Sequence, residues 1–116
     1  EMHFFDAIQC LREAIRLHPK KSYHKLLGQA LMKNPKWLRE AEENFRCALK
    51  MDPFDAECYL GLGEIYESEG MATRAQKMFE QAATYNPESE AVQKKLGSRR
   101  GVAGSALKKL FTRKKD

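Results

Sequence analysis

Three cysteines and three histidines are the side chains of this 116-residue chain whose spacing would most readily reveal a zinc site or a cysteine–histidine nucleophile pair. Cys10, Cys47 and Cys58 show neither a Cys-x2-Cys pair nor another spacing typical of metal ligands. Their neighbours include many alanines and leucines, so we expect all three to be small core residues in a reducing compartment. The cysteines therefore predict no metal site.

The histidines give no better basis for catalysis. They are scattered, without a cysteine or serine placed to act as nucleophile, at positions His3, His18 and His24. The glycines Gly28 and Gly63 lie inside expected helices, so they form no phosphate-binding loop. We predict that the chain is not an enzyme, with no catalytic residue and no cofactor.

A repeat of 34 residues runs through most of the chain. Pro19, Pro53 and Pro87 are spaced by this interval, and each ends an apolar segment with helical periodicity. Other positions recur in step with the prolines: Ala7, Ala41 and Ala75; Leu11, Phe45 and Phe79; Ala14, Ala48 and Ala82. A period of this length predicts a solenoid, in which each unit buries its apolar face against its neighbours.

The residues inside one period identify a family. One unit reads Tyr59-x2-Leu62-Gly63-x2-Tyr66 and then Ala75-x3-Phe79-x2-Ala82-x4-Pro87, which resembles a tetratricopeptide repeat. The preceding unit is looser: it opens with Leu27-Gly28-x2-Leu31, has His24 in place of the first aromatic residue, and ends at Pro53. One extra residue between its two helices falls near Asn34-Pro35-Lys36.

The resemblance implies an all-α, right-handed helical solenoid of about two and a half helix-turn-helix units plus a terminal helix. Residues 1–97 would form it as a half repeat (3–19), two repeats (21–54 and 56–88) and a capping helix (88–97), with a basic flexible tail at 98–116. The expected helices are 3–17, 22–33, 37–51, 56–69, 72–85 and 88–97, with Gly70 as a left-handed cap. Small residues such as Gly28 and Gly63 would let paired helices approach closely, while Phe45 and Phe79 fill the space between layers.

The beginning of the chain predicts a missing neighbour. Met2, Phe4, Phe5, Ile8 and Leu11 precede any helix that could cover them. Because stacked repeats need capped ends, we expect a fragment of a larger, multidomain protein, or a homodimer through this helix. Residues 28–54 and the Lys-rich ending with Leu110 and Phe111 resemble C-terminal repeat segments of bacterial multidomain proteins, which implies a C-terminal fragment of such a protein.

The family usually binds peptides or partner helices on its concave face, through the first helix of each unit. The matching positions are Lys25, Gln29, Met32, Lys33, Glu57, Leu60, Glu64 and Glu67. Gln29 and Glu64 stand where members that clamp a terminal carboxylate would have asparagine, which disfavours that activity. Glu57, Glu64 and Glu67 share one helical surface, so they form either a site for a basic ligand or an ordinary solvated face.

The positive charge is concentrated at the C-terminal end. From residue 94 onward there are nine basic residues and one acidic residue, whereas residues 1–93 carry a net charge of −3. Gly97, Gly101 and Gly104 interrupt this end of the chain before a short amphipathic segment that contains Leu107, Leu110 and Phe111. The basic tail residues are Arg99, Arg100, Lys108, Lys109, Arg113, Lys114 and Lys115.

Three interpretations of this tail stay open: a solvated tail or terminal cap, an anchor to an anionic membrane surface, and, least favoured, a contact to nucleic acid. No apolar run reaches the roughly 20 residues of a membrane-spanning helix, and we expect a cytoplasmic protein. The sequence predicts a scaffold that binds a protein or peptide partner. The alternative is an adaptor that acts on a membrane or nucleic acid through its tail.

Overall fold

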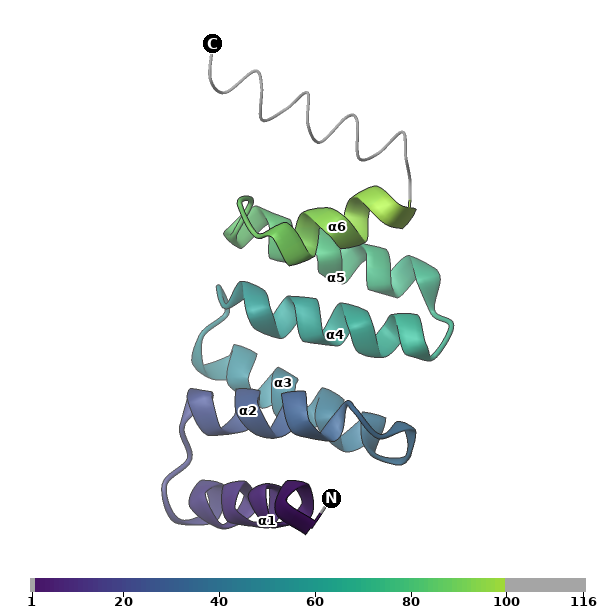
Figure 1. The fold of residues 1–116 in the computed structure, drawn as a ribbon. Helices are drawn as coiled ribbons and strands as arrows, with labels where there is room; N and C mark the ends of the chain where they lie inside the picture. The colour runs from purple at the N-terminus through teal and green to yellow at the C-terminus, as the bar shows by residue number, and fades with distance from the viewer. Residues whose placement is uncertain (1, 100–116) are drawn as a thin grey trace.

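The computed structural model describes residues 2–99, and these residues form six α-helices and one short 3₁₀ helix, with no strand among them (Figure 1). The elements are α1 (Met2–Leu17), α2 (Lys21–Leu31), η1 (Pro35–Trp37), α3 (Leu38–Met51), α4 (Ala56–Ser68), α5 (Ala72–Tyr85) and α6 (Glu90–Arg99). The prediction of an all-helical solenoid is confirmed. No helix in this part of the chain is both long and apolar enough to span a membrane.

The helices stack in chain order. The closest packing joins α4 to α5 and α2 to α3, and α1, α3 and α5 each pack on the helix that follows them. Figure 1 shows α1 at one end of the stack and α6 at the other, and the principal-axis extents are 49 × 27 × 21 Å. Each layer therefore contacts mainly its neighbours, as expected for repeats.

Two local features shape the helix ends. At the extra residue of the first full repeat, α2 stops at Leu31, and the Asn34 side chain accepts a hydrogen bond of 3.0 Å from the Lys36 amide to start η1. Gly70 has a φ of +77°, which confirms the predicted left-handed cap after α4. The two repeats thus turn between their helices in different ways.

Phenylalanine rings against glycine backbones hold the layers together. Phe45 and Phe79 are fully buried. A Cβ atom added at Gly28 would lie 3.0 Å from the Phe45 ring, and one at Gly63 would lie 2.4 Å from the Phe79 ring. This confirms the predicted roles of these four residues. The sequence did not single out Gly61, whose added Cβ would lie 2.5 Å from Phe45, so this ring contacts both α2 and α4.

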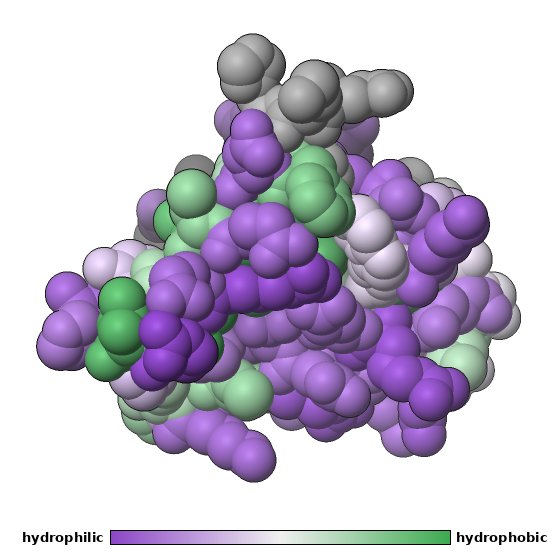
Figure 2. All heavy atoms as spheres, turned by 90° about the horizontal axis from the view of Figure 1, so that it is seen from below, coloured by the Kyte–Doolittle hydropathy of each residue, from purple (hydrophilic) through white to green (hydrophobic). Residues whose placement is uncertain are grey.

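The expectation of an uncovered apolar face on the first helix is wrong for Ile8 and Leu11. Ile8 is fully buried and Leu11 is partly buried against the core, because α2 covers this side of α1. The residues of α1 that face outward are mixed in character: Asp6, Gln9, Glu13 and Arg16 are polar, whereas Phe5 is 48% and Leu17 is 59% exposed. Seen from the α1 end, the surface is mainly hydrophilic with scattered hydrophobic side chains (Figure 2).

The cysteines differ from one another in burial. Cys58 is buried as predicted, and burial raises the pKa of its thiol to about 12. Cys47 is partly exposed, and Cys10 is exposed, so the prediction of a core position is wrong for Cys10. Cys10 lies two residues after the buried Ile8, so it points about 200° around the helix from it, and a small side chain is compatible with either face of a helix. Among the described residues, no group of three or more histidine, cysteine, aspartate or glutamate side chains could hold a metal ion.

Candidate functional site

The eight residues predicted for partner binding lie on α2 and α4 or just after α2, and we call them together the first-helix surface. Lys25 of α2 reaches across to α4, where its Nζ lies 3.3 Å from Glu57 Oε1. The same amine lies 3.1 Å from Oδ2 of Asp55, the N-cap residue of α4. These ion pairs bring the α2 and α4 parts of the surface side by side.

A lysine of α6 extends this surface. Lys95 Nζ lies 2.8 Å from Glu67 Oε1 and 4.0 Å from Glu64 Oε2. Burial raises the pKa of Glu64, the charge of Glu67 acts in the same direction, and Lys95 opposes them. The predicted acidic strip of α4 is therefore paired within the fold, with Lys25 at one end and Lys95 at the other.

Lys95 was counted in the basic segment of the sequence but not assigned to the site. The signal that could have placed it is the repeat itself, since α6 begins a further unit with the pair Leu96-Gly97. The other members of the first-helix surface differ in burial. Met32 and Leu60 pack partly against the core, Gln29 is partly exposed and Lys33 is exposed.

A polar pocket of about 340 Å³ borders the first-helix surface at the turn between α3 and α4. Its lining residues are Lys21, Lys25, Phe54, Asp55, Ala56, Glu57, Tyr85 and Asn86. Phe54 and Tyr85 are exposed, and their rings meet edge to face with centroids 5.3 Å apart. Sequence analysis missed these two aromatic residues, because neither belongs to the repeat motif.

Asp55 organises the entrance to α4. Its Oδ1 accepts a hydrogen bond of 3.0 Å from the Glu57 amide, and its Oδ2 lies 3.2 Å from Lys21 Nζ and 3.1 Å from Lys25 Nζ. Burial alone would raise the pKa of Asp55, but the hydrogen bonds from Lys25 and Lys21 outweigh it and leave the pKa below its usual value.

Replacing Asp55 with alanine is expected to lower the free energy of unfolding by about 1–2 kcal/mol at pH 7, the usual cost of losing an N-cap. Asp55→Asn keeps a capping oxygen and loses only the charge. Because the pKa is depressed in the folded state, the charge stabilises the fold above about pH 4 and ceases to do so as the pH falls through the folded pKa. Urea unfolding from pH 3 to 7 should show wild type and Asp55→Asn converging at low pH; a constant gap would contradict this assignment.

Comparison with known proteins agrees with the packing. The family model described as tetratricopeptide repeat matches residues 56–89. Residues 56–89 are therefore similar to a tetratricopeptide repeat. The match covers α4, α5 and the turn that follows, which is the pair built on Gly63 and Phe79. Tetratricopeptide repeats generally mediate protein–protein interaction, and their all-helical fold typically serves as a scaffold without catalytic activity.

Two curated relatives extend the comparison. Superkiller complex protein 3 of Homo sapiens is 44% identical over 50 residues, and that of Mus musculus is 42% identical over 50 residues. Each alignment covers 43% of this chain and 3% of the relative. The chain thus corresponds to a small part of these relatives. Both are mammalian proteins, and the expected bacterial origin stays a prediction.

The predictions for the basic tail concern residues that are mostly outside the described range. Arg99 ends α6, and the other predicted tail residues lie outside the described residues: Arg100, Lys108, Lys109, Arg113, Lys114 and Lys115. Contacts of this tail with a membrane or nucleic acid, and a homodimer through α1, stay predictions.

Proposed function

We propose that the chain holds a protein partner on its first-helix surface, as an extended peptide or a helix lying across α2, α4 and α6. The observation that carries the proposal is the continuity of this surface. Lys25–Glu57 joins α2 to α4, and Lys95–Glu67 joins α4 to α6, so charged side chains of three helices adjoin one another. This continuity supports a single partner lying across them. The concave shape usual in the family would present the same residues to a partner.

The chemistry of the surface indicates what the partner carries. Charge alternates across the layers, with lysines on α2, glutamates on α4 and Lys95 on α6. Leu60 and Met32 supply partly exposed apolar contacts between these charges. A ligand with an apolar side chain over Leu60 and basic groups that compete with Lys95 for Glu64 fits this pattern. A partner cation would displace Lys95 from Glu64 most easily, because their separation of 4.0 Å is the longest among the ion pairs of the described residues. Burial also disfavours the charged form of Glu64, so a second cation beside it would stabilise its carboxylate.

The relatives support a role in assembly. Their name assigns them to a complex, and the matching segment is of the kind that makes protein contacts. Chain length limits what can be carried over, since the match spans 3% of each relative.

Reversing the charge at Glu64 is the direct test. Glu64→Lys is expected to reduce partner recovery in affinity purification at least about tenfold, because it removes the attraction of Glu64 for the partner's basic groups and replaces it with repulsion between those groups and the new lysine. Glu69→Lys is the matched control: it makes the same charge change at the C-cap of α4, where the exposed Glu69 has no ion pair within the described part of the chain. Partners should be quantified by mass spectrometry, with thermal unfolding to show that both variants remain folded.

An unchanged partner list in Glu64→Lys would remove the acidic part of this surface from the proposal. Deleting residues 100–116 separates the alternative function. A partner held by the first-helix surface should still bind after the deletion. An adaptor that acts through its tail would no longer bind its target, and added salt would abolish binding of the intact chain in the same way.

A further inference from the structure

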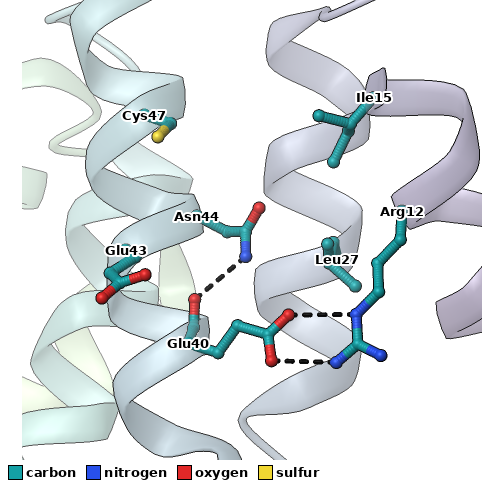
Figure 3. A pocket seen from close by; sticks show the side chains of 7 residues that line it. All are labelled: Arg12, Ile15, Leu27, Glu40, Glu43, Asn44 and Cys47. Carbon is teal, nitrogen blue, oxygen red and sulfur yellow. Dashed lines mark hydrogen bonds and ion pairs between the residues drawn. The ribbon is translucent and has the colours of Figure 1, made fainter. Parts of the chain in front are cut away.

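A second hollow lies between α1 and α3, and we call it the α1–α3 pocket (Figure 3). Its volume is about 230 Å³. In the close view, α1 and α3 form the two sides and a side chain of α2 lies between them. The lining residues are Arg12, Ile15, Leu27, Glu40, Glu43, Asn44 and Cys47.

The α1–α3 pocket is separate from the first-helix surface. Leu27 lies two residues after Lys25 and two before Gln29 on α2, so it points about 200° around the helix from both of them. None of the eight residues of the first-helix surface lines this pocket. A ligand bound here would leave the proposed partner surface free.

The inner part of the pocket consists of apolar side chains and of Asn44, whose polar atoms already have hydrogen-bond partners. Leu27 is 2% exposed, and Ile15 packs partly against the same core. Asn44 donates from Nδ2 to the Glu40 carbonyl oxygen at 2.9 Å, and its Oδ1 lies 3.0 Å from His24 Nδ1. These buried groups offer a ligand carbon surface and leave no unsatisfied polar atom of Asn44 facing it.

The pocket lining has two carboxylates and one guanidinium, so negative charge is in excess. The Arg12 guanidinium donates two hydrogen bonds to the Glu40 carboxylate, from Nε to Oε2 at 3.1 Å and from Nη2 to Oε1 at 2.8 Å. Figure 3 shows this pair crossing one end of the pocket. Within the described part of the chain, Glu43 makes no hydrogen bond or ion pair, so its carboxylate leaves the pocket with one uncompensated negative charge.

The next repeat shows that stacking does not require this arrangement. At positions 34 residues later, Arg12 and Ile15 become Arg46 and Leu49, which are similar. Leu27 corresponds to Leu62, 35 residues later because of the extra residue in the first full repeat, and is unchanged. The other four positions change in character: Glu40 becomes Arg74, Glu43 becomes Lys77, Asn44 becomes Met78 and Cys47 becomes Gln81. The alanine and phenylalanine positions that pack the layers recur, whereas the acidic rim exists in one repeat and is basic in the other. The rim is therefore free to serve a ligand.

We propose that the α1–α3 pocket takes a lysine or arginine side chain of a protein partner. The methylene groups of such a side chain would lie on Ile15 and Leu27, and its cation would reach the Glu43 carboxylate at the rim. Pockets for drug-sized ligands have volumes of about 300–1,000 Å³, so this smaller hollow suits a single side chain. The uncompensated charge selects a cation over an anion.

Titration with short peptides tests the pocket without knowledge of the natural partner. The probes are acetyl-Leu-Lys-Leu-amide and, as the control of opposite charge, acetyl-Leu-Glu-Leu-amide. Backbone amide shifts of the ¹⁵N-labelled full chain are followed by NMR. The lysine peptide is expected to cause saturable shifts at residues 12–15, 27 and 40–47, and the glutamate peptide none.

Glu43→Lys places at the rim the residue type of the next repeat and should weaken binding of the lysine peptide about tenfold. Glu69→Lys, with the same charge change on an exposed site of α4, should leave it unaltered. Both sites are exposed, so the spectra should keep their native dispersion. Shifts that are absent, equal for both peptides or retained in Glu43→Lys would overturn the proposal.

Discussion

Phe45→Ala is expected to lower the free energy of unfolding by about 3–5 kcal/mol, the usual cost of deleting a buried phenylalanine ring. The ring is fully buried and lies against Gly28 on α2 and Gly61 on α4. Removing it leaves a cavity within the first full repeat and also at its contact with the second. Both sides are helix backbone, which closes such a cavity poorly.

The measurement is urea unfolding followed by circular dichroism, with wild type and Phe45→Ala at equal concentration. Domains of this size are stabilised by about 5–15 kcal/mol, so the variant could lose most of its stability, and Phe45→Leu provides a milder variant that keeps part of the volume. Phe54→Ala is the control, since Phe54 is 67% exposed and should cost less than about 1 kcal/mol. An equal loss of unfolding free energy in Phe45→Ala and Phe54→Ala would show that the Phe45 ring does not hold α2 and α4 together.

The periodic part of the fold could be predicted from the sequence because packing between layers repeats. A ring at Phe45 or Phe79 needs a small partner on the preceding helix, and Gly28 and Gly63 supply it at nearly constant separation. Proline then ends each second helix at a fixed distance. The phenylalanine, its glycine partner and the helix-ending proline all lie within one repeat, so one period of sequence is enough to recognise them.

Polar contacts between repeats could not be predicted in the same way. Glu42 accepts a hydrogen bond of 2.6 Å from the Tyr66 hydroxyl, whereas Gln76, which stands 34 residues after Glu42, has a buried Oε1 without a partner among the described residues. Residues 42 and 76 occupy the same position in the repeat, but the helix packed against each one presents different side chains. Such pairing depends on side chains of three helices at once, which spacing along the chain does not specify.

The candidate sites show the same limit. The sequence placed Glu57, Glu64 and Glu67 on one face of α4, but the lysines that pair with them come from α2 and α6. The α1–α3 pocket was not predicted at all, because it depends on how far two second helices lie apart. The error at Cys10 has a related cause: an end helix has only one neighbouring layer, so its other side is exposed.

Gly63→Ala is expected to destabilise the fold, whereas Gly97→Ala is expected to stabilise it slightly. Both glycines follow a leucine in the first helix of a unit, so alanine brings the same gain in helix propensity, at most about 1 kcal/mol. At Gly63 the new Cβ would lie 2.4 Å from the ring of Phe79, which is fully buried and has no room to move. Overpacking of this kind costs about 1–3 kcal/mol, which exceeds the gain.

At Gly97 the new Cβ meets no atom within 4 Å, so only the gain in helix propensity remains, reduced by its place in the last turn of α6. Gly28→Ala should fall between the two, since its Cβ would lie 3.0 Å from the edge of the Phe45 ring. Thermal unfolding should rank the melting temperatures as Gly97→Ala, then Gly28→Ala, then Gly63→Ala, and 1 kcal/mol corresponds to about 4–8 °C in a domain of this size. A Gly63→Ala variant that melts at or above Gly97→Ala would show that these two helices do not pack through the glycine, because only contact with the ring distinguishes the two sites.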